Sequence, residues 1–279
     1  MTTDATKPEP TSNISTRLEA LVSSVLRDAS LGPRMMCVMR QLGLSEQSVM
    51  NGVLRYTLEM DRLTNDYYSS MSARAALYLH SLVLESYHQL RQETVIQFLK
   101  TCGRERLSVV DIGFGVPSKY VTETLSLQKN WRVTLADRDQ EALDFAEAVV
   151  ACAAPTVRPR VSLLRFDMDS AQYVGNFDVF IFMDSIEHAA DPTMVLGTTV
   201  SAAPTDSFFI LSLPICKNPT PMHFIEFLDD EAAIKWLESS GLTVVDSVAA
   251  VPNPEVDYFA SLIDGGFRNL VVLCCKVRT

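Results

Sequence analysis

Acidic side chains follow three successive apolar segments of the chain, each at the point where a buried strand is expected to end. Asp111 opens an Asp-x-Gly-x-Gly turn with Gly113 and Gly115, and Asp137 and Asp167 follow the next two apolar runs. Parallel strands end at a common edge of their sheet, so these residues are expected to lie together. Glycine lets a ligand approach the backbone, and carboxylates accept hydrogen bonds from hydroxyl and amine groups. The series predicts a site for a nucleoside-bearing cofactor.

Each of these residues also has a structural interpretation. Asp111 could face a ligand ammonium or fix its own turn, and Asp137 could cap the following helix. An acid about twenty residues beyond the glycines, at the end of a second strand, typically binds both ribose hydroxyls. Arg138 adjoins it, and Asp167 with Met168 offers an acceptor and an apolar face to a flat base. The coincidence of three acids favours the cofactor over three unrelated turns.

Two histidines could move protons. His188 lies in a Glu-His pair after a fourth apolar run, and His223 lies three residues before Glu226. The ordinary pKa of imidazole suits a general base that deprotonates an acceptor hydroxyl or amine. The structural alternatives are that His188 and Glu187 only hold their loop and that His223 only bonds Glu226. The sequence leaves both interpretations open.

The elements that must position these residues change character near residue 106. Up to about residue 100 the spacing of apolar residues is helical, for example at Leu18, Leu21 and Val25, and Ser45 can cap a helix that starts after it. One long helix is expected from about Ser72. Beyond residue 106 strands and helices alternate, which is typical of an α/β fold with a doubly wound, mostly parallel sheet.

We predict three parts of the chain: a disordered tail over 1–12, a helical region over 13–100 and a core over 101–279. Strands of the core are predicted at Leu107–Ile112, Arg132–Ala136, Val161–Arg165, Phe177–Met183, Ser207–Leu213, Leu242–Ala249 and Asn269–Lys276. Helices are predicted at Ser118–Gln128, Glu141–Cys152, Thr193–Ser201 and Asp230–Ser240. Asp139 stands where it can cap the second of these helices.

The composition argues against several classes of partner. A formal charge of −10 and the lack of any basic run argue against a nucleic acid. No uninterrupted apolar stretch predicts a membrane span. The six cysteines have no spacing typical of zinc or of a disulfide framework. We therefore expect no metal ion, no disulfide framework and a reducing, cytoplasmic location.

The segment around the fourth predicted strand carries the most specific motif. It reads Phe177-Asp178, an apolar strand, the acid Asp184, then Glu187-His188 and Asp191-Pro192. Together with the glycine turn, this segment resembles the class I S-adenosylmethionine-dependent methyltransferases. The resemblance is closest to the small-molecule branch that includes the ubiquinone-biosynthesis O-methyltransferases. It covers about residues 107 to 241 and continues weakly to the end of the chain.

The resemblance implies S-adenosylmethionine as co-substrate and a seven-stranded sheet whose last strand is antiparallel and inserted beside the sixth. It also implies a place for each part of the cofactor: Gly113 and Gly115 for the methionine part, Asp137 for the ribose, Asp167 and Met168 for the adenine, and Met183 and Asp184 at the border of the reacting centre. The chain departs from the family at Val116-Pro117, where a third small residue is common. The methionine part is expected to have less room there.

The function implied is methyl transfer to an O, N or C atom of a small molecule in specialised metabolism. The N-terminal helices would be a lid, and Tyr67 and Tyr68 could close over the sulfonium cation or simply pack in a helix. One alternative keeps the cofactor but needs no acceptor: its aminobutyrate chain cyclises to azetidine-2-carboxylate and methylthioadenosine is released. Another is a cofactor-binding subunit without turnover. Apolar stripes on the lid could also mediate a homodimer.

Overall fold

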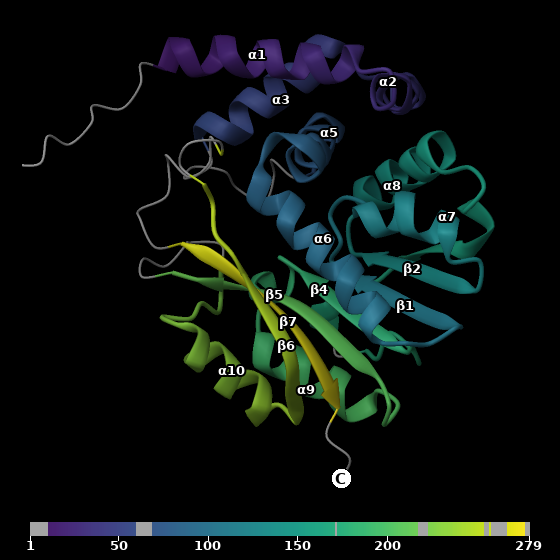
Figure 1. Ribbon diagram of the computed structural model, residues 1–279, viewed down its shortest axis with the longest axis vertical. Helices are drawn as coiled ribbons and strands as arrows, with labels where there is room; N and C mark the ends of the chain where they lie inside the picture. The colour runs from purple at the N-terminus through teal and green to yellow at the C-terminus, as the bar shows by residue number, and fades with distance from the viewer. Residues whose placement is uncertain are drawn as a thin grey trace, which may run out of the picture.

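The computed structural model of the chain describes residues 11–59, 69–170, 172–216, 223–253, 257 and 267–276. Its core is a seven-stranded sheet in the order β3-β2-β1-β4-β5-β7-β6 (Figure 1). The strands are β1 (Leu107–Ile112), β2 (Trp131–Asp137), β3 (Val161–Arg165), β4 (Val179–Met183), β5 (Phe208–Ile215), β6 (Leu242–Ala250) and β7 (Arg268–Lys276). Strands β1 to β5 pair in parallel, whereas β7 is antiparallel to β5 and β6. The predicted sheet, with its last strand inserted beside the sixth, is confirmed.

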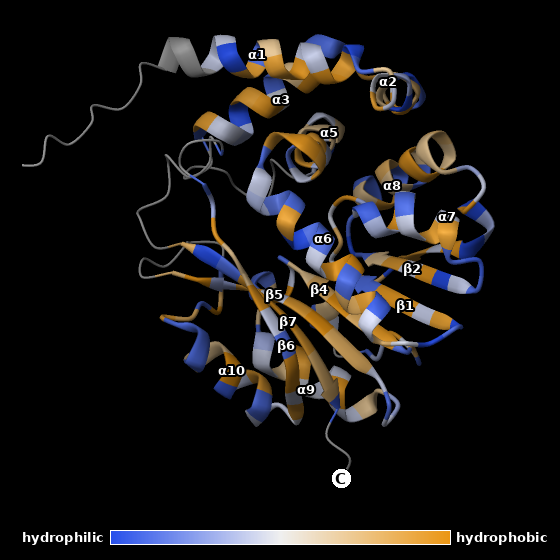
Figure 2. Ribbon diagram, viewed as in Figure 1, coloured by the Kyte–Doolittle hydropathy of each residue, from blue (hydrophilic) through white to orange (hydrophobic). Residues whose placement is uncertain are grey.

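The central strands consist mostly of apolar residues because helices cover both faces of the sheet. In β4, the side chains of Val179, Phe180, Ile181 and Phe182 are all fully buried. Strand β6 lies at the edge, and most of its residues are exposed or half-buried. Figure 2 shows the central strands as mostly hydrophobic ribbons. This pattern is the reason why the strands could be predicted to within two residues at each end.

Two hydrophobic clusters define the two faces of the sheet. Helix α6 (Ser86–Thr101), helix α8 (Gln140–Ala153) and the short turns η3 (Tyr120–Thr124) and α7 (Leu125–Leu127) cover one face. Helices α9 (Pro192–Ala202) and α10 (Asp230–Ser239) cover the other. Aromatic rings fill the second cluster, where Phe180 stacks on Phe209 with their centroids 5.0 Å apart. The core is therefore doubly wound, as predicted.

The N-terminal helical region consists of α1 (Thr11–Arg27), α2 (Gly32–Gln41), α3 (Glu46–Glu59), α5 (Met71–Leu79) and the π-helical turn η2 (His80–Leu84), which leads into α6. A third hydrophobic cluster joins these helices to α8 through Phe145 and Val149. Leu18 and Val22 of α1 are fully buried, and the Ser45 hydroxyl accepts a bond from the Ser48 N–H at 3.1 Å, as expected of a cap. None of the described helices is long and apolar enough to cross a bilayer.

Some predicted helices have different bounds in the structure. Residues 11 and 12, assigned to the tail, already belong to α1. The single long helix predicted from about Ser72 is interrupted at Glu85, whose extended backbone (φ −125°, ψ 122°) separates η2 from α6. The helix predicted over 118–128 is largely a π-helical turn, η3. Apolar spacing does not reveal such interruptions, because the buried stripe continues through them.

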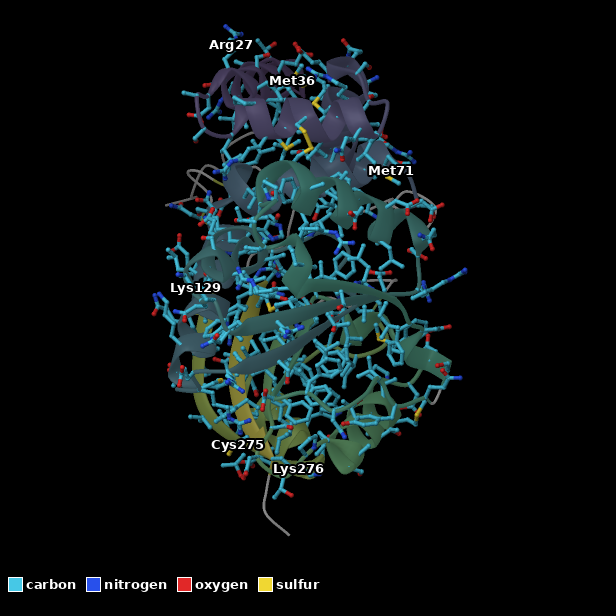
Figure 3. The ribbon with its side chains drawn as sticks, turned by 90° about the vertical axis from the view of Figure 1, so that its right-hand side faces the viewer. Arg27, Met36, Met71, Lys129, Cys275 and Lys276 are labelled. Carbon is cyan, nitrogen blue, oxygen red and sulfur yellow. A yellow bond between two sulfur atoms is a disulfide. The ribbon has the colours of Figure 1, made fainter. Side chains whose placement is uncertain are left out.

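A disulfide bond joins Cys37 of α2 to Cys152 of α8, with a Cα–Cα distance of 5.8 Å (Figure 3). The sequence predicted no such bond, and the spacing of 115 residues gives no local signal for it. Tertiary packing brings the two residues together, because α2 lies against α8. The bond ties the N-terminal helical region to the core.

Replacing Cys37 with Ser should lower the thermal unfolding temperature under non-reducing conditions. Closing a long loop with a disulfide typically adds about 2–4 kcal/mol to the free energy of unfolding. Dithiothreitol should produce the same shift in the wild type and none in Cys37→Ser. Unchanged unfolding, together with six alkylated cysteines in the unreduced wild type, would contradict the bond.

Candidate active site

The glycine turn after β1 brings three loops into contact at the carboxyl edge of the sheet. Gly113 and Gly115 have left-handed backbones, with φ values of +67° and +59°. A Cβ atom on Gly113 would lie 2.7 Å from the Cβ of Ser185, after β4, and 2.9 Å from the Cε of Met168, after β3. Only glycine fits there, because both the backbone angle and the space exclude a side chain.

Asp137 ends β2 beside this turn, as predicted. It is 6% exposed, and its two oxygens accept bonds from the N–H groups of Gly115 (Oδ2, 3.1 Å) and Asp139 (Oδ1, 3.0 Å). Burial raises the pKa of Asp137, while the two N–H groups and Arg74 act to lower it. The carboxylate is thus held by backbone donors and keeps further lone pairs for a ligand.

Asp139 does not do what the sequence predicted. It stands at the N-cap position of α8, but its side chain makes no capping bond. Its Oδ2 instead accepts a bond from the guanidinium of Arg74, on α5, at 2.9 Å. The same guanidinium donates to the carbonyl oxygen of Gly115 at 3.1 Å. The Asp139 side chain therefore bonds a buried arginine of the N-terminal helical region in place of the backbone N–H groups that start α8.

Asp111 is fully buried at the end of β1. Tyr120 donates its hydroxyl to Asp111 Oδ2 at 3.0 Å, and Oδ1 has no protein hydrogen-bond partner. Burial is the main cause that raises the pKa of Asp111 to about 7. The bond from Tyr120 acts to lower this pKa, and the charge of Asp137 raises it further. The group therefore titrates near neutral pH and has a free oxygen for a donor.

Asp184, just after β4, has a left-handed backbone (φ +49°), which is rare for a residue with a side chain. Three elements hold it: Ser212 of β5 and Asn269 of β7 donate to Oδ1 at 2.9 and 2.8 Å, and Arg91 of α6 forms an ion pair with Oδ2. A third of its side chain remains exposed. Its backbone strain and accessible carboxylate fit the predicted place at the reacting centre.

Arg91 is a buried guanidinium that reaches this centre from α6. It also donates to Nδ1 of His88 and lies 5.1 Å from the ring centre of Tyr87. Burial, then the charge of Arg91, hold the pKa of His88 well below its usual range, so the imidazole is neutral. Because a guanidinium can only donate, the proton of this imidazole lies on Nε2.

The Glu-His motif and the segment after β5 meet beside Asp184. The rings of His188 and His223 lie edge to face at 4.9 Å, and His223 Nδ1 bonds Glu226 Oε1 at 2.7 Å. Glu187 is 1% exposed; burial first, then the charge of Asp184, raise its pKa well above the usual range. The two histidines, predicted independently, are thus brought together.

Glu187, His188 and His223 also offer metal-ligand atoms that lie within 4.8 Å of one another. Two ligands of one tetrahedral zinc ion stand roughly 3.4 Å apart at metal–nitrogen distances near 2.1 Å. The bond to Glu226 already occupies one nitrogen of His223. The expectation of a metal-free site is a prediction that this geometry does not test.

Other predicted residues have more varied positions. Met168 packs over Gly113, and Met183 packs against the core cluster below the edge. Asp167 is exposed and accepts a bond from the Asp169 N–H. Arg138 is exposed, and its Nε lies 3.8 Å from Asp139 Oδ1. Tyr67 and Tyr68 lie outside the described residues.

Helices α5 and α6 and strand β7 contribute five residues that the sequence did not predict, namely Arg74, Tyr87, His88, Arg91 and Asn269. A signal for the arginines exists: each is a charge on a helix face that is otherwise buried. Arg74 stands between Ala73 and Ala75, and both alanines are fully buried. Such a charge must find a partner, but the sequence does not say where.

Buried polar atoms without a protein partner gather at this edge of the described structure. The acceptors are Asp111 Oδ1, Glu187 Oε2 and Asn269 Oδ1, and nearby are Ser185 Oγ, Arg91 Nε and His88 Nε2. Buried polar groups are normally paired, so these atoms indicate a polar ligand that offers both hydrogen-bond donors and acceptors. The amine, the ribose hydroxyls and the carboxylate of S-adenosylmethionine fit that description.

No protein-family profile matches the chain, and no curated protein sequence matches it. Solved structures do match. The StiE O-methyltransferase domain (residues 961–1257) is 12% identical with a TM-score of 0.53, covering 81% of each chain. NodS, an N-methyltransferase from Bradyrhizobium japonicum WM9 bound to S-adenosylhomocysteine, is 13% identical with a TM-score of 0.52, covering 71% of this chain and 91% of its own.

A third match is magnesium protoporphyrin IX methyltransferase from Synechocystis PCC 6803 with bound S-adenosylmethionine. It is 15% identical with a TM-score of 0.50, covering 83% of this chain and 98% of its own. Identities this low establish shared architecture. The chain therefore has the fold of the S-adenosylmethionine-dependent methyltransferases, and the predicted resemblance is confirmed at that level.

Replacing Asp111 with Asn should stabilise the protein more at pH 8 than at pH 5. The folded-state pKa of Asp111, about 7, lies above its ordinary value of 3.8, so the folded protein binds this proton more tightly than the unfolded chain. The stability that this proton contributes is therefore lost between about pH 4 and about pH 7, and the gain should differ between pH 5 and pH 8 by roughly 3 kcal/mol. Thermal unfolding at both pH values measures the gain. An equal gain at both would contradict a raised pKa.

Proposed function

We propose that this protein is an S-adenosylmethionine-dependent methyltransferase that acts on a small molecule. One observation carries the proposal: the left-handed Gly113 and Gly115 follow β1 directly and stand against the buried carboxylate of Asp137 at the end of β2. The fold supports the same cofactor, since NodS and the Synechocystis enzyme share it and hold S-adenosylhomocysteine and S-adenosylmethionine.

The charges of the site favour such a cofactor. Its sulfonium and ammonium groups are cationic, and the carboxylates of Asp111, Asp137 and Asp184 lie at the same edge of the sheet. Asp137 would bind the ribose hydroxyls with the lone pairs left by its backbone bonds, and Asp111 Oδ1 would accept from the ammonium. Met168, packed over Gly113, would offer an apolar face to the adenine.

The bound cofactor would supply an electrophilic methyl group. His223 is suited to take the proton of the acceptor. An ionised Glu226 can only accept, so the Nδ1 of His223 donates to it and the lone pair of a neutral ring lies on Nε2. His188, edge to face with this ring, would help to orient it, and Asp184 would line the reacting centre.

The N-terminal helical region would serve as the lid that excludes water and selects the acceptor. Support comes from α5, whose Arg74 donates to the carbonyl of Gly115 in the glycine turn. A homodimer formed through apolar stripes of this region stays a prediction from the sequence.

Calorimetry with S-adenosylhomocysteine tests the cofactor. Replacing Asp137 with Ala should weaken binding by about tenfold to a hundredfold, the usual cost of charged hydrogen bonds. Asp144→Ala is the matched control, because Asp144 is an exposed acid on α8 that accepts a bond from the Gln140 side chain. The absence of heat with the wild type, or equal affinities of the wild type and Asp137→Ala, would refute the proposal.

Product analysis separates methyl transfer from the cyclisation alternative. Incubated with S-adenosylmethionine alone, the enzyme should release no methylthioadenosine, because our proposal requires an external acceptor. S-adenosylhomocysteine should form only when an acceptor is added. Methylthioadenosine formed together with azetidine-2-carboxylate, detected by mass spectrometry, would favour cyclisation instead.

A further inference from the structure

We infer that Arg74 makes the N-terminal helical region part of the cofactor site: it is a positioning residue that closes a ring of hydrogen bonds around Gly115 and Asp137. This inference rests on the proposed function. It adds a role to a residue that lies on α5, 41 positions before the glycine turn that it contacts. The sequence motif of the core does not include it.

The ring has four members and can be followed bond by bond. Arg74 donates from Nη1 to the carbonyl of Gly115 (3.1 Å) and from Nη2 to Asp139 Oδ2 (2.9 Å). The N–H of Gly115 donates to Asp137 Oδ2 (3.1 Å). The N–H of Asp139 donates to Asp137 Oδ1 (3.0 Å) and closes the circuit. Each member is therefore held on two sides.

The environment of Arg74 makes these bonds strong determinants of its position. The residue is 4% exposed, so its charge has lost its hydration and depends on protein partners. Its planar guanidinium bonds a carbonyl and a carboxylate at the same time. A lysine ammonium, on a flexible side chain, does not hold two such acceptors in a fixed geometry. Helix α5 packs against α8, whose first turn follows Asp139 (Figure 1). The guanidinium thus spans the seam between helical region and core.

Two groups that would face the cofactor are set by this ring. The left-handed conformation of Gly115 shapes the turn for the methionine part, and the orientation of Asp137 presents its remaining lone pairs to the ribose. Because Arg74 would fix both the Gly115 turn and the Asp137 carboxylate, the position of α5 would affect the affinity for the cofactor. Cofactor binding should in turn hold α5 in place, because coupling between two sites is reciprocal.

The test measures S-adenosylhomocysteine binding by calorimetry in the full-length protein. Arg74→Met, which keeps the length and loses the donors, should weaken binding about tenfold to a hundredfold. The affinity of Arg74→Lys should lie between those of the wild type and Arg74→Met, since one ammonium replaces only some of the guanidinium donors. Arg40→Met, a loss of an exposed arginine on α2, is the control and should leave the affinity unchanged.

A double-mutant cycle separates positioning from general destabilisation. In the Asp137→Ala background, Arg74→Met should cost much less affinity than in the wild type, because the ring is already open. Hydrogen exchange supplies a second readout: S-adenosylhomocysteine should slow exchange of residues 71–79 in the wild type and not in Arg74→Met. If Arg74→Met does not fold, Arg74→Lys carries both measurements.

Additive losses in the cycle, or wild-type affinity in Arg74→Met, would overturn this inference and leave the methyltransferase proposal standing. A wild-type protein that binds no S-adenosylhomocysteine would instead overturn the proposed function and this inference together. The two failures are therefore distinguishable by the wild-type titration.

Discussion

The burial of carboxylates at the ends of parallel strands is the constraint on which the rest of this structure depends. Asp111, Asp137 and Glu187 are each at least 94% buried at one edge of the sheet. An unpaired buried charge is costly, so each group must either bind its proton or collect donors. Burial raises the pKa of all three, and Asp137 also accepts bonds from two backbone N–H groups, which act to lower its pKa.

This constraint explains why the N-terminal helical region is joined so closely to the core. Arg74 of this region and Arg91 of α6, the helix that follows it, bring two buried positive charges to an edge rich in carboxylates. The disulfide between Cys37 and Cys152 adds a covalent bond between this region and the core. These attachments fit the proposed role of the region as a structural part of the site in addition to a cover for it.

The two halves of the site differ in how their geometry is maintained. On the side proposed for the cofactor, backbone groups and glycines dominate, and the shape is set by left-handed turns at Gly113 and Gly115. On the side proposed for the acceptor, side chains dominate: Asp184 is held by Ser212, Asn269 and Arg91. Backbone geometry suits a constant ligand, while side-chain networks can change with the acceptor. Such a division fits a fold that serves many methyl acceptors.

The sequence by itself determined the sheet, its helices and the glycine turn with its neighbouring acid, because alternating apolar segments and glycines impose local geometry wherever they occur. It also indicated His188 and His223 as candidate site residues, although it did not predict that their rings lie in contact. Only the tertiary structure decided that Asp139 binds Arg74, that Arg91 pairs with Asp184 and that Cys37 meets Cys152. These pairs join residues 65, 93 and 115 positions apart. Partners so distant are selected by packing and charge in three dimensions, and no local pattern encodes them.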